Sequence, residues 1–356
     1  MSQMDRIGRL LDDSLAAGLG SAAAVSVGDG GREVFRYLAG TVRRVPDRGP
    51  AVTEHSRFDL ASLTKPMATV AIAMVLAAEH RLDLDAPVRA YLPHAATTAS
   101  VRQLLAHAAG CAAHVEFFRH LRAARPANPR EVLVERALRE PCDPPGVAAV
   151  YSDLGFIQLG ALLERAAGLP LETAFAELVA GPLGLAAGYA PGAPLAGCVA
   201  TELDDRGLVC GVVHDENCAA GGGVAGHAGL FGTIDDVARF AAAIVDTAAG
   251  TPRGRFTTDA VTRFVTDAPL PGSPWRLGWD TPSATPGISQ AGDRWPRTGA
   301  VGHTGFTGTS LWLDLPHRRW VALLTNRVHP TRHRGTAEQI KALRRAVNDA
   351  VVDALQ

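Results

Sequence analysis

The chain has 356 residues, of which 47% are hydrophobic and 20% are charged, and its formal net charge is −1. This length can bury a substantial core, and the balanced charge excludes a general electrostatic binder of nucleic acids or membrane surfaces. Of the 35 basic residues, only Lys65 and Lys341 are lysines. We expect Lys341 to lie on the surface of a terminal helix, whereas Lys65 stands in the most informative motif of the chain.

The cysteines and the apolar runs indicate in which compartment of the cell the protein is expected. The cysteines are odd in number and none is spaced as Cys-x-x-Cys, which argues against a disulfide framework or a zinc site. Residues 1–15 carry acidic side chains where a signal peptide needs an apolar core, so they are predicted to form an amphipathic helix. The longest apolar run, 66–78, is too short to span a bilayer and is predicted to be a buried helix. We therefore expect a cytoplasmic protein with reduced thiols.

Both chain ends have the pattern of a sheet. The runs 22–27 and 33–39 flank a glycine-rich turn at 28–31, and the runs 310–315 and 320–325 flank a turn at 316–319, so each pair is predicted to be a hairpin. Residues 336–355 have helical periodicity. We predict one α/β (α+β) domain over 1–356. An antiparallel sheet of about five strands, from regions 20–60 and 296–356, is flanked by terminal helices and lies beside a mostly helical region, 64–290.

A Ser-x-x-Lys motif, Ser62 and Lys65, opens the apolar helix. On an α-helix, three residues rise about 4.5 Å and rotate by about 300°, which places both side chains on one face. A serine hydroxyl needs a neighbour to take its proton, and lysine can do so only as the free amine. Burial and the positive end of the helix are expected to lower the pKa of Lys65. The Ser62 N–H would supply half of an oxyanion hole. Alternatively, Ser62 caps the helix and Lys65 is solvated.

Two further elements supply companions. Tyr151 and Asp153 precede a helical segment, and a phenol beside a lysine can relay a proton, while a polar residue at 153 can bind substrate or Lys65. The plainer interpretation is a helix start with residue 152 or 153 as N-cap.

The second element is His303, Thr304, Gly305 and Phe306, just before the strand at 310. Gly305 would let substrate approach the strand edge, and the Phe306 N–H would be the second oxyanion donor. His303 and Thr304 would face the leaving group or a substrate carboxylate. The plainer interpretation is a glycine-rich strand entrance with an incidental histidine.

These three motifs, in this order, resemble the penicillin-recognising serine hydrolases, in the branch that holds class C β-lactamases, D-alanyl-D-alanine peptidases and family VIII esterases. The resemblance covers about residues 20–350 and includes the stretches 104–110, 226–231 and 324–327. It implies that Ser62 is the acylated nucleophile, that Lys65 and Tyr151 form the acid/base pair, that Asp153 takes the third position of the triplet and that residues 303–305 line the edge strand. It implies no cofactor.

Two positions depart from the family pattern. Asp153 stands where asparagine is usual, so an anion could hold Lys65 protonated at rest. His303 stands where β-lactamases carry lysine, which removes a fixed positive charge for a substrate carboxylate. Both departures weaken the case for β-lactam hydrolysis and favour an esterase, amidase or peptidase with smaller or less charged substrates.

A second polar cluster comprises His214, Asp215, Glu216 and, after a glycine-rich stretch, His227. It suggests a metal site, but we favour a loop beside the cleft, where His214 and Asp215 hydrogen-bond backbone, His227 touches substrate and no metal is bound. His107 is expected to be structural, and Gly232 to Asp236 is predicted to cap a helix. Near the last hairpin lies a basic patch, which we expect to be solvated and which consists of His329, Arg332, His333 and Arg334.

The leading hypothesis is therefore a serine hydrolase that acts on a carboxylic ester or amide of a small molecule or short peptide. The same motifs leave an acyltransferase or peptide cyclase open, and also a binding module that β-lactams acylate once. We expect no nucleic-acid or membrane partner, and the oligomeric state stays open.

Overall fold

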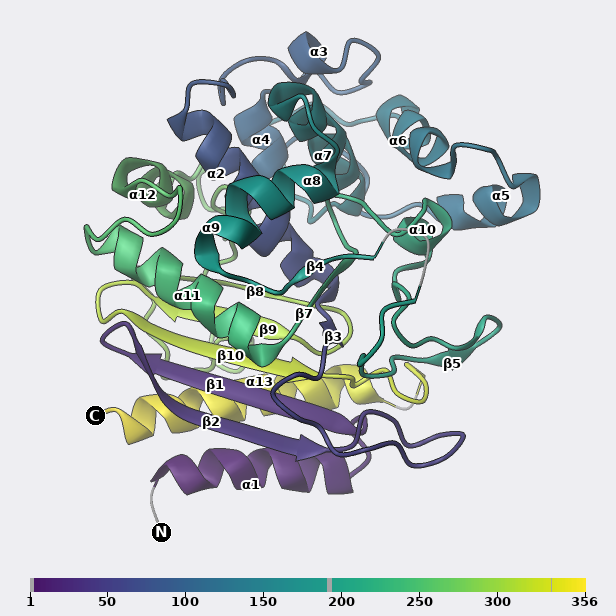
Figure 1. Ribbon diagram of the computed structural model, residues 1–356. Helices are drawn as coiled ribbons and strands as arrows, with labels where there is room; N and C mark the ends of the chain where they lie inside the picture. Colours follow the sequence, from purple (N-terminus) through teal and green to yellow (C-terminus); the bar gives the residue numbers. More distant parts are fainter. Residues whose placement is uncertain (1–2, 191–193, 334) are drawn as a thin grey trace.

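The structure is a computed structural model that describes residues 3–190, 194–333 and 335–356. Its main element is a five-stranded antiparallel sheet in the order β2-β1-β10-β9-β8. The strands are β1 (Ala22–Asp29), β2 (Arg32–Gly40), β8 (Ala300–Thr304), β9 (Ser310–Asp314) and β10 (Arg319–Thr325). The predicted antiparallel sheet from both chain ends is confirmed, with its two hairpins (Figure 1).

The central strands β1 and β10 are buried because helices cover both faces of the sheet. In β1 the residue Val25 pairs with Leu323 of β10 on one side and with Tyr37 of β2 on the other. Gly28 pairs with Trp320, and a Cβ at residue 28 would lie 2.2 Å from the indole ring. Glycine is therefore required where the large ring lies across the neighbouring strand.

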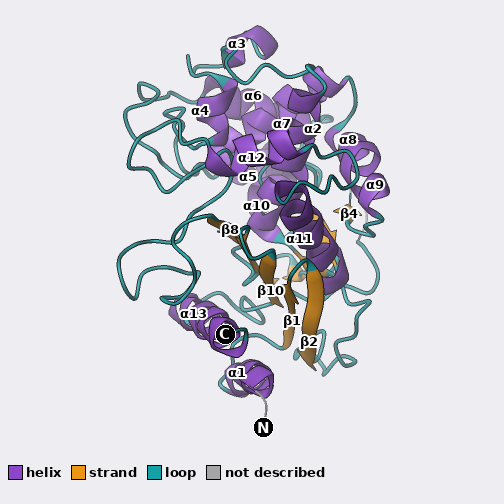
Figure 2. Cartoon of the chain, turned by 90° about the vertical axis from the view of Figure 1, so that its left-hand side faces the viewer, coloured by secondary structure: helices purple, strands orange, loops and turns teal. Residues whose placement is uncertain are grey.

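The helices on the two faces come from different parts of the chain (Figures 1 and 2). Helices α1 (Gln3–Ala16) and α13 (Thr336–Ala354) pack together below the sheet, as predicted for the termini. The other face is covered by α11 (Ile234–Ala248), which contacts β1, β9 and β10. The expected division into a terminal sheet region and a separate helical region is therefore too simple, because α11 of the middle region packs on the sheet.

The helices of the middle region other than α11 lie above the sheet in Figure 1. They are α2 (Ala71–Ala78), α3 (Val88–Tyr91), α4 (Val101–Leu105), α5 (Phe117–Ala124), α6 (Pro129–Arg139), α7 (Asp153–Ala167), α8 (Leu171–Phe175), η3 (Ala176–Ala180), α9 (Gly181–Leu183), α10 (Glu216–Ala220) and α12 (Thr258–Thr266). Two small sheets were not predicted, because strands of two or three residues show no periodicity. They comprise β3 (Phe58–Asp59), β7 (Leu230–Gly232) and β4 (Gly188–Tyr189), and the pair β5 (Leu203–Asp204) and β6 (Gly207–Leu208).

The segment that carries the Ser-x-x-Lys motif is helical but irregular. A 3₁₀ turn η1 (Ala61–Leu63) is followed by a π-helical stretch η2 (Lys65–Val70), which runs into α2. By length and composition alone, Ala61–Ala78 could cross a membrane, but 83% of it is buried inside the protein. The prediction of a buried helix is confirmed, whereas its regular α-helical start is not.

Candidate active site

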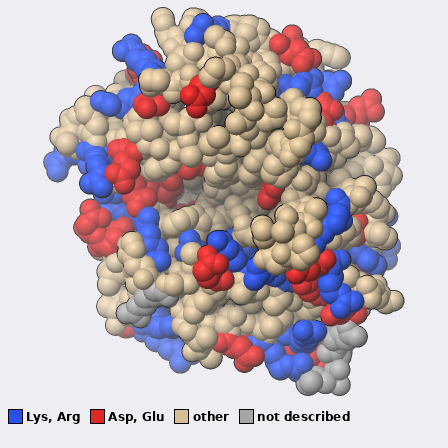
Figure 3. Space-filling view, turned by 180° about the vertical axis from the view of Figure 1, so that it is seen from behind, with Lys and Arg blue, Asp and Glu red and all other residues tan. Residues whose placement is uncertain are grey.

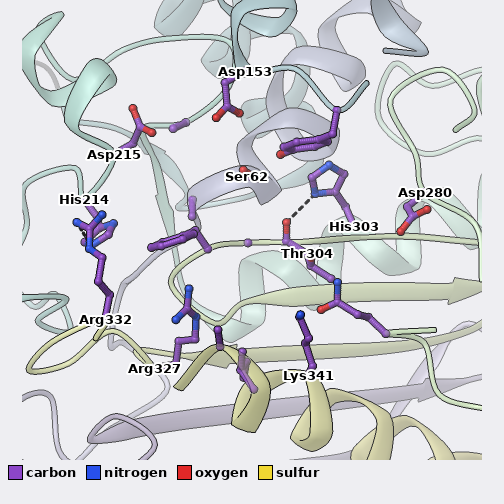
Figure 4. Close-up of a pocket in the computed structure, with 18 of the residues that line it drawn as sticks. Ser62, Asp153, His214, Asp215, Asp280, His303, Thr304, Arg327, Arg332 and Lys341 are labelled. Carbon is purple, nitrogen blue, oxygen red and sulfur yellow. Dashed lines mark hydrogen bonds between the residues drawn. The ribbon is translucent and has the colours of Figure 1, made fainter. Parts of the chain in front are cut away.

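A pocket of about 670 Å³ lies between the helices of the middle region and the β8 edge of the main sheet. Its lining includes Ser62, Tyr151, Asp153, His303 and Phe306. Figure 4 shows Ser62 near the centre of this pocket, with the labelled residues arranged around it. The face seen in Figure 3 is hollowed near its centre, and acidic and basic side chains lie close together around the hollow.

The Ser62 hydroxyl and the Lys65 amine are in contact. Lys65 Nζ donates a hydrogen bond to Ser62 Oγ at 3.0 Å, and the Lys65 side chain is fully buried. The sequence predicted this contact from α-helical spacing, but the backbone that makes it is a 3₁₀ turn followed by a π-helix. Ala61, next to the serine, has φ of 47°, a strained value for a residue with a side chain.

Lys65 has two further acceptors, Asp153 Oδ1 at 2.8 Å and the carbonyl of His227 at 3.1 Å. Burial lowers the pKa of Lys65, but the Asp153 carboxylate and the Tyr151 phenol outweigh burial, so the pKa lies above its ordinary value. The expected lowering is therefore not found in this resting arrangement. The anticipated effect of Asp153 is found, because the carboxylate keeps the amine protonated.

Asp153 is the first residue of α7, where the helix N-terminus favours an anion. Burial raises the pKa of this carboxyl, but Lys65, His114 and His227 together outweigh burial, so the pKa lies below its ordinary value. His114 Nδ1 also lies 3.6 Å from Asp153 Oδ2. Asp153 is thus a largely buried carboxylate, with 20% of its side chain exposed, that lies between Lys65 and His114.

Tyr151 is held by its neighbours in the chain and by ring contacts. Ser152 caps α7 by accepting from the Gly155 N–H at 2.9 Å. His107 Nδ1 accepts from the Ser152 N–H at 3.1 Å, and its ring centroid lies 4.7 Å from that of Tyr151. Lys65 Nζ is 4.8 Å from the centroid of the Tyr151 ring. Burial raises the pKa of Tyr151, so the group beside the amine is a neutral phenol. His107 has the structural position that was expected of it.

The β8 edge closes the pocket on the side of the sheet. Thr309 Oγ1 donates to the carbonyl of Leu60 at 3.0 Å, which ties the β8–β9 turn to the segment of Ser62. A Cβ at Gly305 would lie 2.0 Å from Thr309 Oγ1 and 2.8 Å from the Leu60 oxygen. Gly305 is therefore needed for the packing of this turn, and not for the approach of substrate alone.

His303 and Phe306 lie on either side of that glycine and line the pocket. His303 Nδ1 lies 2.9 Å from the Thr304 carbonyl, and burial lowers the pKa of His303 to about 3, so the ring is neutral. Its buried Nε2 has no hydrogen-bond partner among the described residues. Phe306 is 49% exposed in the pocket.

The second polar cluster divides into two separate pairs. His214 Nε2 lies 2.9 Å from Glu202 Oε2, and His227 Nε2 lies 2.9 Å from Asp215 Oδ1. Within the described residues, no three His, Cys, Asp or Glu side chains converge as metal ligands would. The His227 side chain is 1% exposed and does not line the pocket, so the expectation that it touches substrate is wrong. His227 reaches the site through its carbonyl, which accepts from Lys65.

The predicted solvated patch near the last hairpin is wrong for two of its members. Arg332 lines the pocket and donates to Glu202 and Glu216 at 2.7 Å each. His329 is buried and accepts the Arg44 N–H at 2.8 Å. Arg334 lies outside the described residues, and His333 is exposed.

Sequence reasoning also missed four charged residues that line the pocket, Asp280, Arg327, Lys341 and Arg344. Arg327 and Arg344 are buried, and Lys341, expected on the surface, lines the pocket with 47% of its side chain exposed. Burial raises the pKa of Asp280 to about 7. Only Arg327 carried a signal, as part of the matching stretch 324–327.

Residues 9–345 match the family model described as Beta-lactamase. N-acetylmuramyl-L-alanine amidase of Bacillus subtilis (strain 168) is 28% identical over 363 residues, which cover 92% of this chain and 81% of the amidase. Among solved structures, SurE is 25% identical with a TM-score of 0.74 over 99% of this chain and 76% of its own, and it has also been solved with D-Leu. EstCE1, described as a hydrolase with promiscuous acyltransferase activity, is 23% identical with a TM-score of 0.71 over 98% of each chain.

Proposed function

Because the chain belongs to the beta-lactamase family, we propose that it is a serine hydrolase that cleaves a carboxylic ester or amide through an acyl-enzyme on Ser62. The observation that carries this proposal is the 3.0 Å contact between Lys65 Nζ and Ser62 Oγ, beside a pocket of about 670 Å³. A hydroxyl with a base at hydrogen-bond distance is the arrangement that nucleophilic acyl transfer needs. The chemistry uses this chain's own side chains and calls for no cofactor.

In the proposed reaction, the neutral Lys65 amine takes the proton of Ser62 as Oγ attacks the substrate carbonyl. The N–H groups of Ser62 and Phe306 then stabilise the oxyanion of the tetrahedral intermediate. Tyr151 gives its proton to the leaving group as the carbonyl–heteroatom bond breaks, and then takes the proton that Lys65 accepted from Ser62, so both groups are neutral again. Attack by water on the acyl-enzyme, with Lys65 again accepting a proton, releases the acid and restores Ser62.

The direct test is intact-protein and peptide mass spectrometry after exposure to a panel of activated esters, D-amino-acid amides and a fluorescent penicillin. We expect a mass increase equal to the acyl group, on the peptide that contains Ser62. D-amino-acid amides belong in the panel because the similar protein SurE has been solved with D-Leu. An adduct that maps to any other residue, or no adduct with any compound, would contradict the proposal.

The same site supports a second candidate, the transfer of the acyl group to an alcohol or amine. The size of the pocket favours it, because about 670 Å³ leaves room for an acceptor beside the acylated serine. The similar fold of EstCE1 occurs in a hydrolase with acyltransferase activity. Adding alcohols and amines during turnover separates the two, since a transferase forms the new ester or amide faster than the free acid. A sensor would instead be labelled once and release nothing.

The raised pKa of Lys65 leads to a prediction for Asp153→Asn. The resting amine is protonated, so acylation should accelerate with pH as Lys65 loses its proton. Asparagine keeps the size and an acceptor for Lys65 but removes the negative charge, so burial should then lower the pKa of Lys65. A nearby opposite charge shifts a pKa by about 1–3 units, and we expect the rising limb of kcat/KM to move down by about one pH unit or more. An unchanged pH profile in this variant would show that another group titrates.

A further inference from the structure

Two of the five cysteines are in contact with each other, outside the pocket. Cys111 follows α4 and Cys142 follows α6 in the chain, and their Sγ atoms lie 3.7 Å apart. Both are free thiols in the structure. A disulfide has an S–S bond of about 2.05 Å, so a short approach of the two sulfurs separates this pair from a covalent bond.

The backbone segments that carry the two thiols already lie side by side. The Asp143 N–H donates to the carbonyl of Gly110 at 2.9 Å, one residue away from each cysteine. A Cβ at Gly110, where φ is 74°, would lie 1.9 Å from the Asp143 oxygen, so the two backbones are as close as they can be. The sulfurs therefore close the remaining gap by rotation of the cysteine side chains, while the backbone stays in place.

The two thiols differ in exposure and in reactivity. Cys111 is 5% exposed, and its sulfur also accepts from Gln158 Nε2 of α7 at 3.7 Å, whereas Cys142 is half-buried. The hydrogen bond between the thiols lowers the pKa of Cys142 and, together with burial, raises the pKa of Cys111. The thiolate is the form that reacts with oxidants. Cys142 is thus the sulfur that an oxidant reaches first, with Cys111 beside it as a protonated thiol.

We propose that Cys142 and Cys111 form a modification site at which a hydroperoxide converts the two thiols into a reversible disulfide. The Cys142 thiolate attacks one peroxide oxygen, the O–O bond breaks, and Cys142 becomes a sulfenic acid while the leaving oxygen takes a proton to form water or an alcohol. Cys111 then attacks the sulfenic sulfur, the S–O bond breaks, and the hydroxide leaves as water with the Cys111 proton. The two sulfurs give two electrons to the peroxide, and a dithiol such as dithiothreitol returns them.

The cross-link would anchor the segment that positions Tyr151. The Val150 N–H donates to the carbonyl of His107, and the Asp153 N–H donates to the carbonyl of Ala113, each at 2.9 Å. The buried cysteine of the pair lies between these two acceptors along the chain. A disulfide there restrains the support of the catalytic phenol and adds no group to the pocket, so oxidation should stabilise the fold and spare the site. This inference does not depend on the proposed function.

The test is peptide mapping of the reduced protein before and after hydrogen peroxide, with the remaining thiols alkylated by iodoacetamide before digestion. Trypsin leaves the two cysteines in separate peptides, residues 103–119 and 140–165. We expect peroxide to produce a linked species with the mass of both peptides less two hydrogen atoms, and dithiothreitol to separate it. The oxidised protein should also have a higher Tm than the reduced protein, because the cross-link restricts the unfolded chain.

Three variants assign the roles of the thiols. Cys142→Ser should abolish the linked species and leave Cys111 as a thiol after peroxide. Cys111→Ser should stop the reaction at the sulfenic acid of Cys142, which dimedone traps as a covalent adduct. Cys210→Ser is the matched control, because Cys210 is also half-buried but its Sγ donates to the carbonyl of Cys198 at 3.3 Å. That variant should form the linked species as the wild-type protein does.

The wild-type mapping decides even where a variant fails to fold. If peroxide produces no linked species, joins either cysteine to a different one, or carries Cys142 on to the sulfinic acid, the proposal is overturned. The rate of Ser62 acylation should be the same before and after oxidation, and a loss of that rate would contradict closure by side-chain rotation alone. Because the disulfide is read by mass and Tm, its outcome is independent of whether any ester acylates Ser62.

Discussion

Ser62→Ala should lower kcat by about 10⁶-fold, the size of loss found when the serine nucleophile is removed from a hydrolase. The substitution deletes the attacking oxygen, while Lys65 keeps its hydrogen bonds to Asp153 and to the carbonyl of His227. The pocket should therefore persist and still bind substrate. Release of 4-nitrophenolate measures the rate, and intact-protein mass spectrometry should show that the acyl adduct is gone.

Two controls make this result specific. Ser283→Ala changes a loop serine that does not line the pocket, and it should keep the wild-type rate and adduct. Thermal unfolding of Ser62→Ala should match that of the wild-type protein, because one hydroxyl is lost from a partly exposed position. A Ser62→Ala protein that still forms the acyl adduct would contradict the assignment of Ser62 as the nucleophile.

Lys65→Ala is expected to slow acylation by about 10³- to 10⁴-fold, the upper part of the range for general acid–base catalysis. Among the described residues, no other basic side chain lies at hydrogen-bond distance from Ser62 Oγ. The measurement is the rate of the acyl burst with an activated ester, followed by rapid mixing. Arg239→Ala removes a basic side chain of α11 that does not line the pocket and that pairs with Asp235 at 2.6 Å, and it should change the burst rate little.

Loss of Lys65 also leaves the Asp153 carboxylate without its ammonium partner. Breaking a buried ion pair costs about 3–5 kcal/mol, so the single variant should unfold at a lower temperature. The double variant Lys65→Ala, Asp153→Asn removes both charges and should recover most of that stability without recovering activity. If activity returned with stability, Lys65 would be a structural residue and not the base.

Much of the fold follows from local pattern. The two hairpins are recognisable because each has a turn of polar, Gly or Pro residues between apolar runs, and the helix starts at Ser152 and Thr233 are recognisable from their capping residues. The two- and three-residue strands β3, β4 and β7 were not predicted, since pairing with distant segments creates them. The irregular helix at Ser62 was missed for the same reason. Thr64 and Thr69 there bond to Leu230 and to Gly226, far along the chain.

The residues proposed for the chemistry could be chosen from the sequence because they occur in three short motifs with distinctive spacing. The charge state of Lys65 and the surroundings of Arg327 could not, because both depend on side chains more than 80 residues away or on burial against other elements. Asp153 reaches Lys65 only once α7 packs beside η2. Burial then makes the electrostatic attraction between the two side chains much stronger than it would be at the surface. Arg332 was expected to be solvated, but folding brings the segment between β10 and α13 against the pocket, and Arg332 lines it. Short-range spacing is encoded in the chain itself, whereas desolvation and distant charge pairs exist only after folding.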